Sequence, residues 1–220
     1  GNLENPGQLE KTGRLKWIQL NNAGTEGYCV PGRLPQGAVL TNATGAYGLA
    51  ISEHMLACLF MLRKKLNLYY ANQLQRQWKS EGHVGVIQGT TVLVIGLGDI
   101  GTCFASKMKA LGCTTIGVKR RVGEKPDCVD GLYGMEELDS LLPRADVVAL
   151  SLPGNPSTYH TLNRERIALL SPNAIVLNVG RGTAVDTDAL SDALYAGKIA
   201  GTALDVTDPE PLPADHPLWK

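Results

Sequence analysis

From residue 91 onward, short and almost wholly apolar runs alternate with segments in which apolar residues recur every three or four positions. Continuous apolar runs are typical of strands buried on both faces of a parallel sheet, and the longer spacing is typical of helices with one buried face. Gly112 and Gly197 stand where helices should end, and Asp186 or Thr187 can cap a helix start. The pattern predicts strands over 91–95, 114–118, 147–152, 174–179 and 201–206, and helices over 100–111, 135–142, 164–170 and 187–195.

Strands that alternate with helices in this way build a doubly wound α/β domain, whose ligands bind where the carboxyl ends of the strands meet. Upstream, apolar residues keep a helical period across 46–77, which predicts one long helix packed against the sheet domain or, as the alternative, against a partner subunit. Residues 1–45 offer one good strand, over 15–20, and a turn at 21–24. Because that is too little for a core of its own, this segment is expected to be the end of another domain.

Composition narrows the class of protein. Hydrophobic residues make up 44% and charged residues 19%, as in soluble globular proteins, and 21 basic residues balance 21 acidic ones. Nothing therefore predicts a nucleic-acid or membrane partner, and the longest apolar stretch, 55–62, is too short to span a bilayer. Five cysteines without a C-x-x-C pair indicate reduced, mostly packed thiols of a cytoplasmic protein, and four scattered histidines predict no metal site. The chain starts with Gly1 and stops at Lys220 without a completed helix, so both ends are expected to be cut.

A glycine-rich turn directly follows the strand at 91–95. Gly96, Gly98 and Gly101 have the spacing G-x-G-x-x-G and lead into the helix at 100–111. The first glycine of such a turn permits the sharp bend, the second lets a phosphate approach the backbone, and the third lets the helix pack closely on the strand. The sequence therefore predicts a Rossmann-type dinucleotide-binding domain over 46–220, with its long helix at 46–77 and its core at 90–206.

The end of the next strand bears on the choice of cofactor. About twenty residues beyond the glycine turn, an NAD-binding site places an acidic residue for the ribose hydroxyls. Here the strand at 114–118 ends in Lys119, Arg120 and Arg121, with no acidic residue at that position. Cations would bind a 2′-phosphate, so NADP is favoured. NAD is the alternative, because a basic strand end can also lie in solvent beside an NAD site.

Motifs spread over nearly the whole chain match one family. They are 15–19 with Ala23-Gly24, 51–54, 94–101, 150–153 with Thr158, 178–182 with 185–186, 201–206, 210–213 and 216–219. Together they resemble the D-isomer-specific 2-hydroxyacid dehydrogenases. The resemblance implies hydride transfer between a nicotinamide cofactor and C2 of a small 2-oxo or 2-hydroxy acid. It also implies a homodimer formed through the cofactor domain, and a second, flavodoxin-like substrate domain of which residues 1–45 would be the C-terminal remnant.

The same resemblance implies site residues. Arg181 matches the catalytic arginine, whose planar guanidinium suits a 2-oxo acid because it can form two parallel bonds. Glu210 matches the glutamate that holds the catalytic histidine and raises its pKa. The amides of Ala23 and Gly24 match the loop that grips the substrate carboxylate. With the basic strand end included, the expected cofactor-binding residues are Gly96, Gly98, Asp99, Ile100, Gly101, Lys119, Arg120, Arg121, Leu152, Pro153, Thr158, Val179, Gly180 and Asp205.

One family feature is absent from these residues. The family carries its catalytic histidine in a Thr-Pro-His segment shortly after a stretch that is 216–219 here. His216 lies within that stretch and is not the proton donor. His160 matches a position without an acid/base role, His54 is expected to pack, and His83 is unassigned. Two alternatives to the enzyme therefore stay open: a cofactor-gated binding protein like the C-terminal-binding corepressors, and a dinucleotide-binding fragment that catalyses nothing.

Overall fold

The computed structural model describes residues 7, 9, 13–25 and 27–219 of the chain. Its centre is a six-stranded parallel sheet with the strand order β5-β4-β3-β6-β7-β8. The chain proceeds outward from β3 to β5 and then returns to β6 beside β3, so the order reverses between β3 and β6. The predicted doubly wound α/β architecture is confirmed. The strands are β3 (Thr91–Ile95), β4 (Thr114–Val118), β5 (Gly131–Tyr133), β6 (Val147–Leu150), β7 (Ile175–Asn178) and β8 (Gly201–Leu204).

Helices cover both faces of this sheet, and the side chains of β3 show how the layers divide. Val92 and Val94 belong to the cluster that contains α1 (Gly48–Arg63) and α3 (Asp99–Ala110). Leu93 and Ile95 belong to the opposite cluster, which contains α4 (Leu138–Leu141), α5 (Arg164–Ile167) and α6 (Thr187–Tyr195). All four β3 side chains are fully buried, as a strand covered on both faces requires. Short 3-10 turns lie at Met135–Glu137, Leu142–Arg144, Pro156–Thr158, Gly182–Ala184 and Pro217–Trp219.

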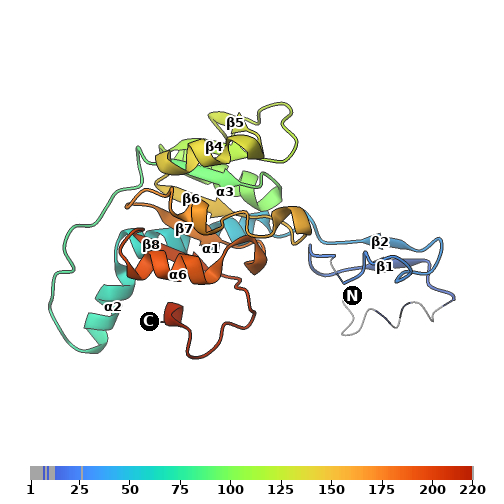
Figure 1. Cartoon of the computed structure of the whole chain (residues 1–220), viewed down its shortest axis with the longest axis horizontal. Coiled ribbons are helices and arrows are strands. Elements are labelled where there is room, and N and C mark those ends of the chain that lie inside the picture. The colour runs from blue at the N-terminus through green and yellow to red at the C-terminus, as the bar shows by residue number, and fades with distance from the viewer. Residues whose placement is uncertain (1–6, 8, 10–12, 26, 220) are drawn as a thin grey trace.

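Two parts of the chain extend away from this sheet domain (Figure 1). At one end, β1 (Trp17–Gln19) and β2 (Val39–Thr41) form a parallel two-stranded sheet with a small cluster of Leu9, Ile18, Leu20 and Tyr28. At the other end lies α2 (Leu66–Leu74), in which Asn72 is the one buried residue. No helix within the described ranges is long and apolar enough to cross a membrane.

The single long helix expected over 46–77 is wrong. The chain breaks after α1, where Lys65 adopts the left-handed backbone conformation with φ 55°, and restarts as α2. The basic side chains at the break bond to a segment that returns beside them: Lys64 Nζ donates to the carbonyl oxygen of Gly85 at 2.8 Å, and Lys65 Nζ donates to that of Glu81. Packing against the sheet domain, which the sequence favoured for the whole helix, applies to α1.

Smaller differences from the predicted elements have local causes. β2 and β5, which are three residues long, were not predicted, and β5 begins with Gly131, which weakens its apolar pattern. The helix expected over 135–142 is split into α4 and two flanking 3-10 turns, the second of which contains Pro143. The helix expected over 164–170 ends at Ile167. Two of the five free cysteines, Cys113 and Cys128, are buried, so the expectation of mostly packed thiols was too strong.

Candidate functional site

The glycine turn lies at the carboxyl end of β3, beside the point where the strand order reverses. Gly96 has φ +97°, which a side chain rarely tolerates, and so it makes the bend. A Cβ on Gly101 would lie 1.9 Å from the carbonyl oxygen of Gly96, so only glycine lets α3 begin so close to the strand end. A Cβ on Gly98 would meet nothing within 4 Å. The backbone is therefore bare and open at Gly98, where α3 starts.

This geometry fits a dinucleotide pyrophosphate. The first N–H groups of a helix have no partner within the helix, and the helix dipole adds positive charge there. Gly98 is the N-cap of α3 and supplies no side-chain cap to those groups. Ile100, in the first turn, packs with its side chain against the apolar cluster beneath. The amides at this helix start can thus face an anion without obstruction.

Asp99 has a contact that sequence reasoning missed. Its carboxylate oxygen Oδ2 accepts a hydrogen bond from the backbone N–H of Gly48, the first residue of α1, at 2.8 Å. A Cβ on Gly48 would lie 2.5 Å from Asp99 Oδ1, so a side chain at position 48 would displace the Asp99 carboxylate. The side chain expected to bind cofactor therefore ties the start of α1 to the start of α3.

The basic strand end is as open as the sequence indicated. Lys119 is half-buried at the end of β4, with its backbone N–H donating to the carbonyl oxygen of Tyr133 at 3.2 Å, and Arg120 and Arg121 are exposed. In the described part of the chain, none of the three side chains forms a hydrogen bond or an ion pair. Three cations without a partner among the described residues thus follow the carboxyl end of β4.

The loop after β6 is held by hydrogen bonds among its own residues. The Thr158 hydroxyl contacts the carbonyl oxygen of Pro153 at 2.6 Å and that of Asn155 at 2.9 Å, and it accepts from the Asn155 N–H at 3.2 Å. Leu152 is buried, whereas Pro153 is exposed. Thr158 therefore shapes this loop, a role that the family motif did not reveal.

A buried amide fixes the turn that carries Arg181. Asn178 ends β7 with no exposed surface; its Nδ2 donates to the carbonyl oxygen of Arg181 at 3.0 Å, and its Oδ1 accepts from the Gly180 N–H at 3.1 Å. A Cβ on Gly180 would lie 2.5 Å from backbone atoms of Leu152, so the loops after β6 and β7 are in tight contact. The half-buried Val179 lies between these two anchored residues. A fully polar residue at the end of an apolar strand was the available signal for Asn178.

Arg181 and Glu210 line one cavity, of about 830 Å³. Arg181 is half-buried, and its Nη1 donates to the carbonyl oxygen of Gly180 at 2.8 Å. Glu210 is exposed, and in the described part of the chain its carboxylate has no hydrogen-bond or ion-pair partner. Tyr159, stacked on His160 at 4.0 Å, forms part of the wall. Two residues far apart in sequence thus place opposite charges in one hollow at the strand ends.

At the end of β8, Asp205 has a neighbour that the sequence did not reveal. The Oδ1 atom of Asp205 lies 4.0 Å from Nε2 of His54, and that nitrogen lies 3.5 Å from Sγ of Cys58. Burial raises the pKa of the Cys58 thiol, and the negative charge of Asp205 adds to the effect. His54 is exposed on α1, contrary to the expectation that it packs. Among the described residues, no group of three or more His, Cys, Asp or Glu could hold a metal ion.

Ala23 and Gly24 lie apart from the cavity of Arg181 and Glu210, of which neither is a lining residue. The carbonyl oxygen of Ala23 accepts from Asn42 Nδ2 at 2.7 Å, which fixes the turn beside β1 and β2. Within the described ranges neither residue's amide donates a hydrogen bond. These amides are therefore available to an acceptor.

Comparison with known proteins agrees with this architecture. The family model described as the D-isomer specific 2-hydroxyacid dehydrogenase, NAD binding domain, matches residues 56–220. A glyoxylate reductase of Thermofilum pendens is 30% identical over 96% of this chain and 64% of its own length. This chain spans between 40% and 68% of the length of the first three curated relatives that it matches.

Solved structures show the same fold. A D-isomer specific 2-hydroxyacid dehydrogenase family protein from Aeromonas salmonicida superposes with a TM-score of 0.86 at 36% identity, over 96% of this chain and 67% of that one. A family member from Xanthobacter autotrophicus, solved in complex with NADPH and MES, superposes with a TM-score of 0.81 at 30% identity, over 93% of this chain and 64% of that one.

Proposed function

The chain belongs to the D-isomer specific 2-hydroxyacid dehydrogenases, NAD(P)-dependent oxidoreductases of small 2-hydroxy and 2-oxo acids, and we propose that its protein reduces a 2-oxo acid at C2 with NADPH. The observation that carries this proposal is that two features lie at the carboxyl ends of the strands of one sheet. The open glycine turn at Gly98 can hold the cofactor, and Arg181 lies with Glu210 in the cavity at the ends of β7 and β8.

Each group has a distinct part in the proposed reaction. The bound nicotinamide supplies the hydride. The Arg181 guanidinium binds the substrate carboxylate and polarises the carbonyl at C2, because its planar fork matches both oxygens. The Glu210 carboxylate, which has no partner among the described residues, would raise the pKa of a neighbouring histidine, so that the histidine can hold and donate the proton. In the family that histidine lies shortly beyond residues 216–219.

We assign the preference for NADP to the basic end of β4. Lys119, Arg120 and Arg121 have no partner in the described part of the chain, and a 2′-phosphate would give them one. A charge-assisted hydrogen bond contributes about 1.5–3 kcal/mol, so two good ones correspond to roughly a hundredfold preference or more. Titration with NADP and NAD of the unmodified protein, of Arg120→Ala and of the control Lys125→Ala, which lies outside this strand end, tests the assignment. Equal affinities would contradict it.

We further propose that residues 1–45 belong to a second, substrate-binding domain, and that residues 46–220 form the cofactor domain. Two short parallel strands with a four-residue buried cluster are far below what an independent domain needs. The unengaged amides of Ala23 and Gly24 would grip the substrate carboxylate from that domain.

We also propose a homodimer that forms through α2. A nine-residue helix in water is marginal without packing, and α2 buries one residue against its own chain. Leu66, Tyr70 and Leu74 are 53%, 61% and 67% exposed, and Trp78 beyond the helix is fully exposed. Apolar surface gathered in this way is typical of a contact between subunits.

Substitution of Arg181 tests the proposed reaction. Arg181→Lys keeps the charge but loses the planar fork, so we expect kcat on glyoxylate, hydroxypyruvate or phenylpyruvate to fall at least about a hundredfold in the intact protein, with cofactor affinity unchanged. Arg164→Lys, on the surface of α5, is the matched control. Near-normal kcat/KM in Arg181→Lys would show that Arg181 is not the carboxylate clamp.

A further inference from the structure

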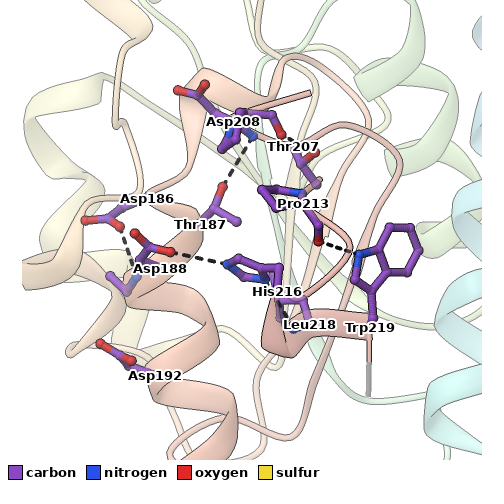
Figure 2. A network of polar contacts seen from close by, with 12 residues as sticks. Asp186, Thr187, Asp188, Asp192, Thr207, Asp208, Pro213, His216, Leu218 and Trp219 are labelled. Carbon is purple, nitrogen blue, oxygen red and sulfur yellow. Dashed lines mark hydrogen bonds and ion pairs between the residues drawn. The ribbon is translucent and has the colours of Figure 1, made fainter. Parts of the chain in front are cut away.

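His216 is the most completely engaged histidine among the described residues. Its side chain is 12% exposed, and both ring nitrogens have partners. Nε2 lies 3.2 Å from Oδ1 of Asp188 on α6, and Nδ1 accepts from the backbone N–H of Leu218 at 3.2 Å (Figure 2). Because a backbone N–H can only donate, Nδ1 carries no proton in this arrangement. The ring is therefore the tautomer with its proton on Nε2, which it donates to Asp188.

This histidine lies in the segment that carries Glu210. After β8 the chain passes Glu210 and returns to α6, to which hydrogen bonds attach it before and after Glu210. Figure 2 shows both contacts, Asp208 with Thr187 and His216 with Asp188. Before Glu210, the Asp208 N–H donates to Oγ1 of Thr187 at 3.4 Å. After Glu210, His216 bonds to Asp188, the residue next to Thr187.

Two further hydrogen bonds hold the segment after Glu210. Trp219 Nε1 donates to the carbonyl oxygen of Pro213 at 2.9 Å, and the Tyr195 hydroxyl at the end of α6 donates to that of Pro217 at 2.8 Å. Glu210 itself has no hydrogen bond in the described part of the chain. Its position therefore depends on the attachments on either side of it, and among the described residues His216–Asp188 is the contact to α6 that pairs two side chains.

We propose that His216 is a positioning residue: through Asp188 it fixes the segment that places Glu210 in the cavity with Arg181. This inference rests on the proposed function, because it gives Glu210 a catalytic role. In this positioning role His216 contacts neither substrate nor cofactor. Loss of the contact should lower kcat, because Glu210 would sample positions away from the reacting groups, while the binding groups at Gly98 and Arg181 stay in place.

Glutamine and asparagine at position 216 can each replace one of the two hydrogen bonds of the His216 ring. In His216→Gln the amide nitrogen can reach the place of Nε2 and donate to Asp188, whereas in His216→Asn the amide oxygen can replace Nδ1 as acceptor for Leu218. We expect His216→Ala, His216→Asn and Asp188→Ala to lower kcat about tenfold, with KM for the 2-oxo acid and for the cofactor within twofold of the unmodified protein. His216→Gln should restore most of kcat, and the double variant His216→Ala/Asp188→Ala should be no slower than either single one.

Asp192 supplies the matched control. It lies one turn after Asp188 on the same helix and pairs with Arg164 at 2.9 Å. Asp192→Ala should leave kcat unchanged. The inference is overturned if Asp192→Ala slows the reaction as much as Asp188→Ala, if KM rises while kcat is unchanged, or if the two single losses add in the double variant.

A second measurement separates this inference from the proposed function. Amide hydrogen exchange over 206–219 should be faster in His216→Ala than in His216→Gln, whatever the protein catalyses. If the unmodified protein reduces no 2-oxo acid but this difference is seen, the attachment is real and the proposed function fails. Equal exchange in the two variants overturns the attachment itself.

Discussion

Helices α2 and α6 are both nine residues long, yet the chain stabilises them very differently. Helix α6 starts after Asp186, whose Oδ1 accepts from the Ala189 N–H at 2.9 Å, and it buries five residues in the sheet domain. Helix α2 starts after the left-handed Lys65 without a side-chain cap, and it buries Asn72 alone. The first is part of the folded core and positions the candidate site. The second offers its apolar residues to solvent in the single chain.

The same substitution should have very different effects on stability in the two helices. Leu190 in α6 has no exposed surface, so Leu190→Ala should lower the free energy of unfolding by about 2–5 kcal/mol through lost burial and a cavity. Leu74 in α2 is 67% exposed, so Leu74→Ala should change it by less than about 0.5 kcal/mol. Denaturant unfolding at one low protein concentration measures both. Similar losses would mean that Leu74 is packed in solution as closely as Leu190, and would contradict the exposed surface of α2.

The proposed dimer predicts a second difference between the two helices. If the apolar surface of α2 is covered by another subunit, Trp78→Ser should weaken self-association by about 2 kcal/mol, or roughly thirtyfold in Kd, as expected for an aromatic residue central to an interface. Sedimentation equilibrium measures this. Trp17→Ser, at a 63% exposed tryptophan of β1, is the control and should leave association unchanged. A monomeric unmodified protein would contradict the dimer.

The sequence predicts well those elements whose stabilising contacts are local, and it misses those that depend on distant segments. Helix α6 was predicted with both ends, because its cap at Asp186 and its apolar spacing are local. The break before α2 was not, because it depends on lysines bonding to residues that follow much later in the chain. The same limit applies at the site. The glycine turn is a local spacing, whereas the contacts of Asp99 with Gly48 and of His216 with Asp188 join distant segments.

Family motifs and structure also contributed different parts of the site. The roles of Arg181 and Glu210 came from resemblance alone, since neither an arginine between glycines nor a glutamate among prolines indicates catalysis by itself. The structure adds that both line one cavity, and that Ala23 and Gly24 do not. It also adds Asn178, which fixes the turn of Arg181 from within the sheet.

Loss of the N-cap of α6 should have a smaller effect on stability than loss of its buried leucine. Asp186→Ala removes the acceptor for the Ala189 N–H, so the free energy of unfolding should fall by about 1 kcal/mol. Asp186→Asn, which retains an acceptor, should restore most of this loss. Thermal or denaturant unfolding measures both, and an equal loss in the two variants would show that the carboxylate acts by charge and not as a cap.

Lowering the pH should reduce the amide protection of α2 before that of α6, and this is the smallest effect that we expect. The Glu81 carboxylate accepts from Asn72 Nδ2 of α2 at 2.6 Å and pairs with Lys79 Nζ at 3.0 Å. The hydrogen bond from Asn72, followed by that from Lys79, lowers the pKa of Glu81 below its usual 4.5. A carboxyl group of this kind stabilises the folded state above its unfolded pKa, and the contribution is lost as the pH falls through the lower folded value.

Below about pH 4.5, amide protection should therefore decrease in α2 while it persists in α6. Hydrogen exchange corrected for the intrinsic pH dependence measures this difference. Glu81→Gln should reproduce the loss at pH 6, because it removes the charge without acid. Simultaneous loss of protection in both helices would contradict the separate attachment of α2.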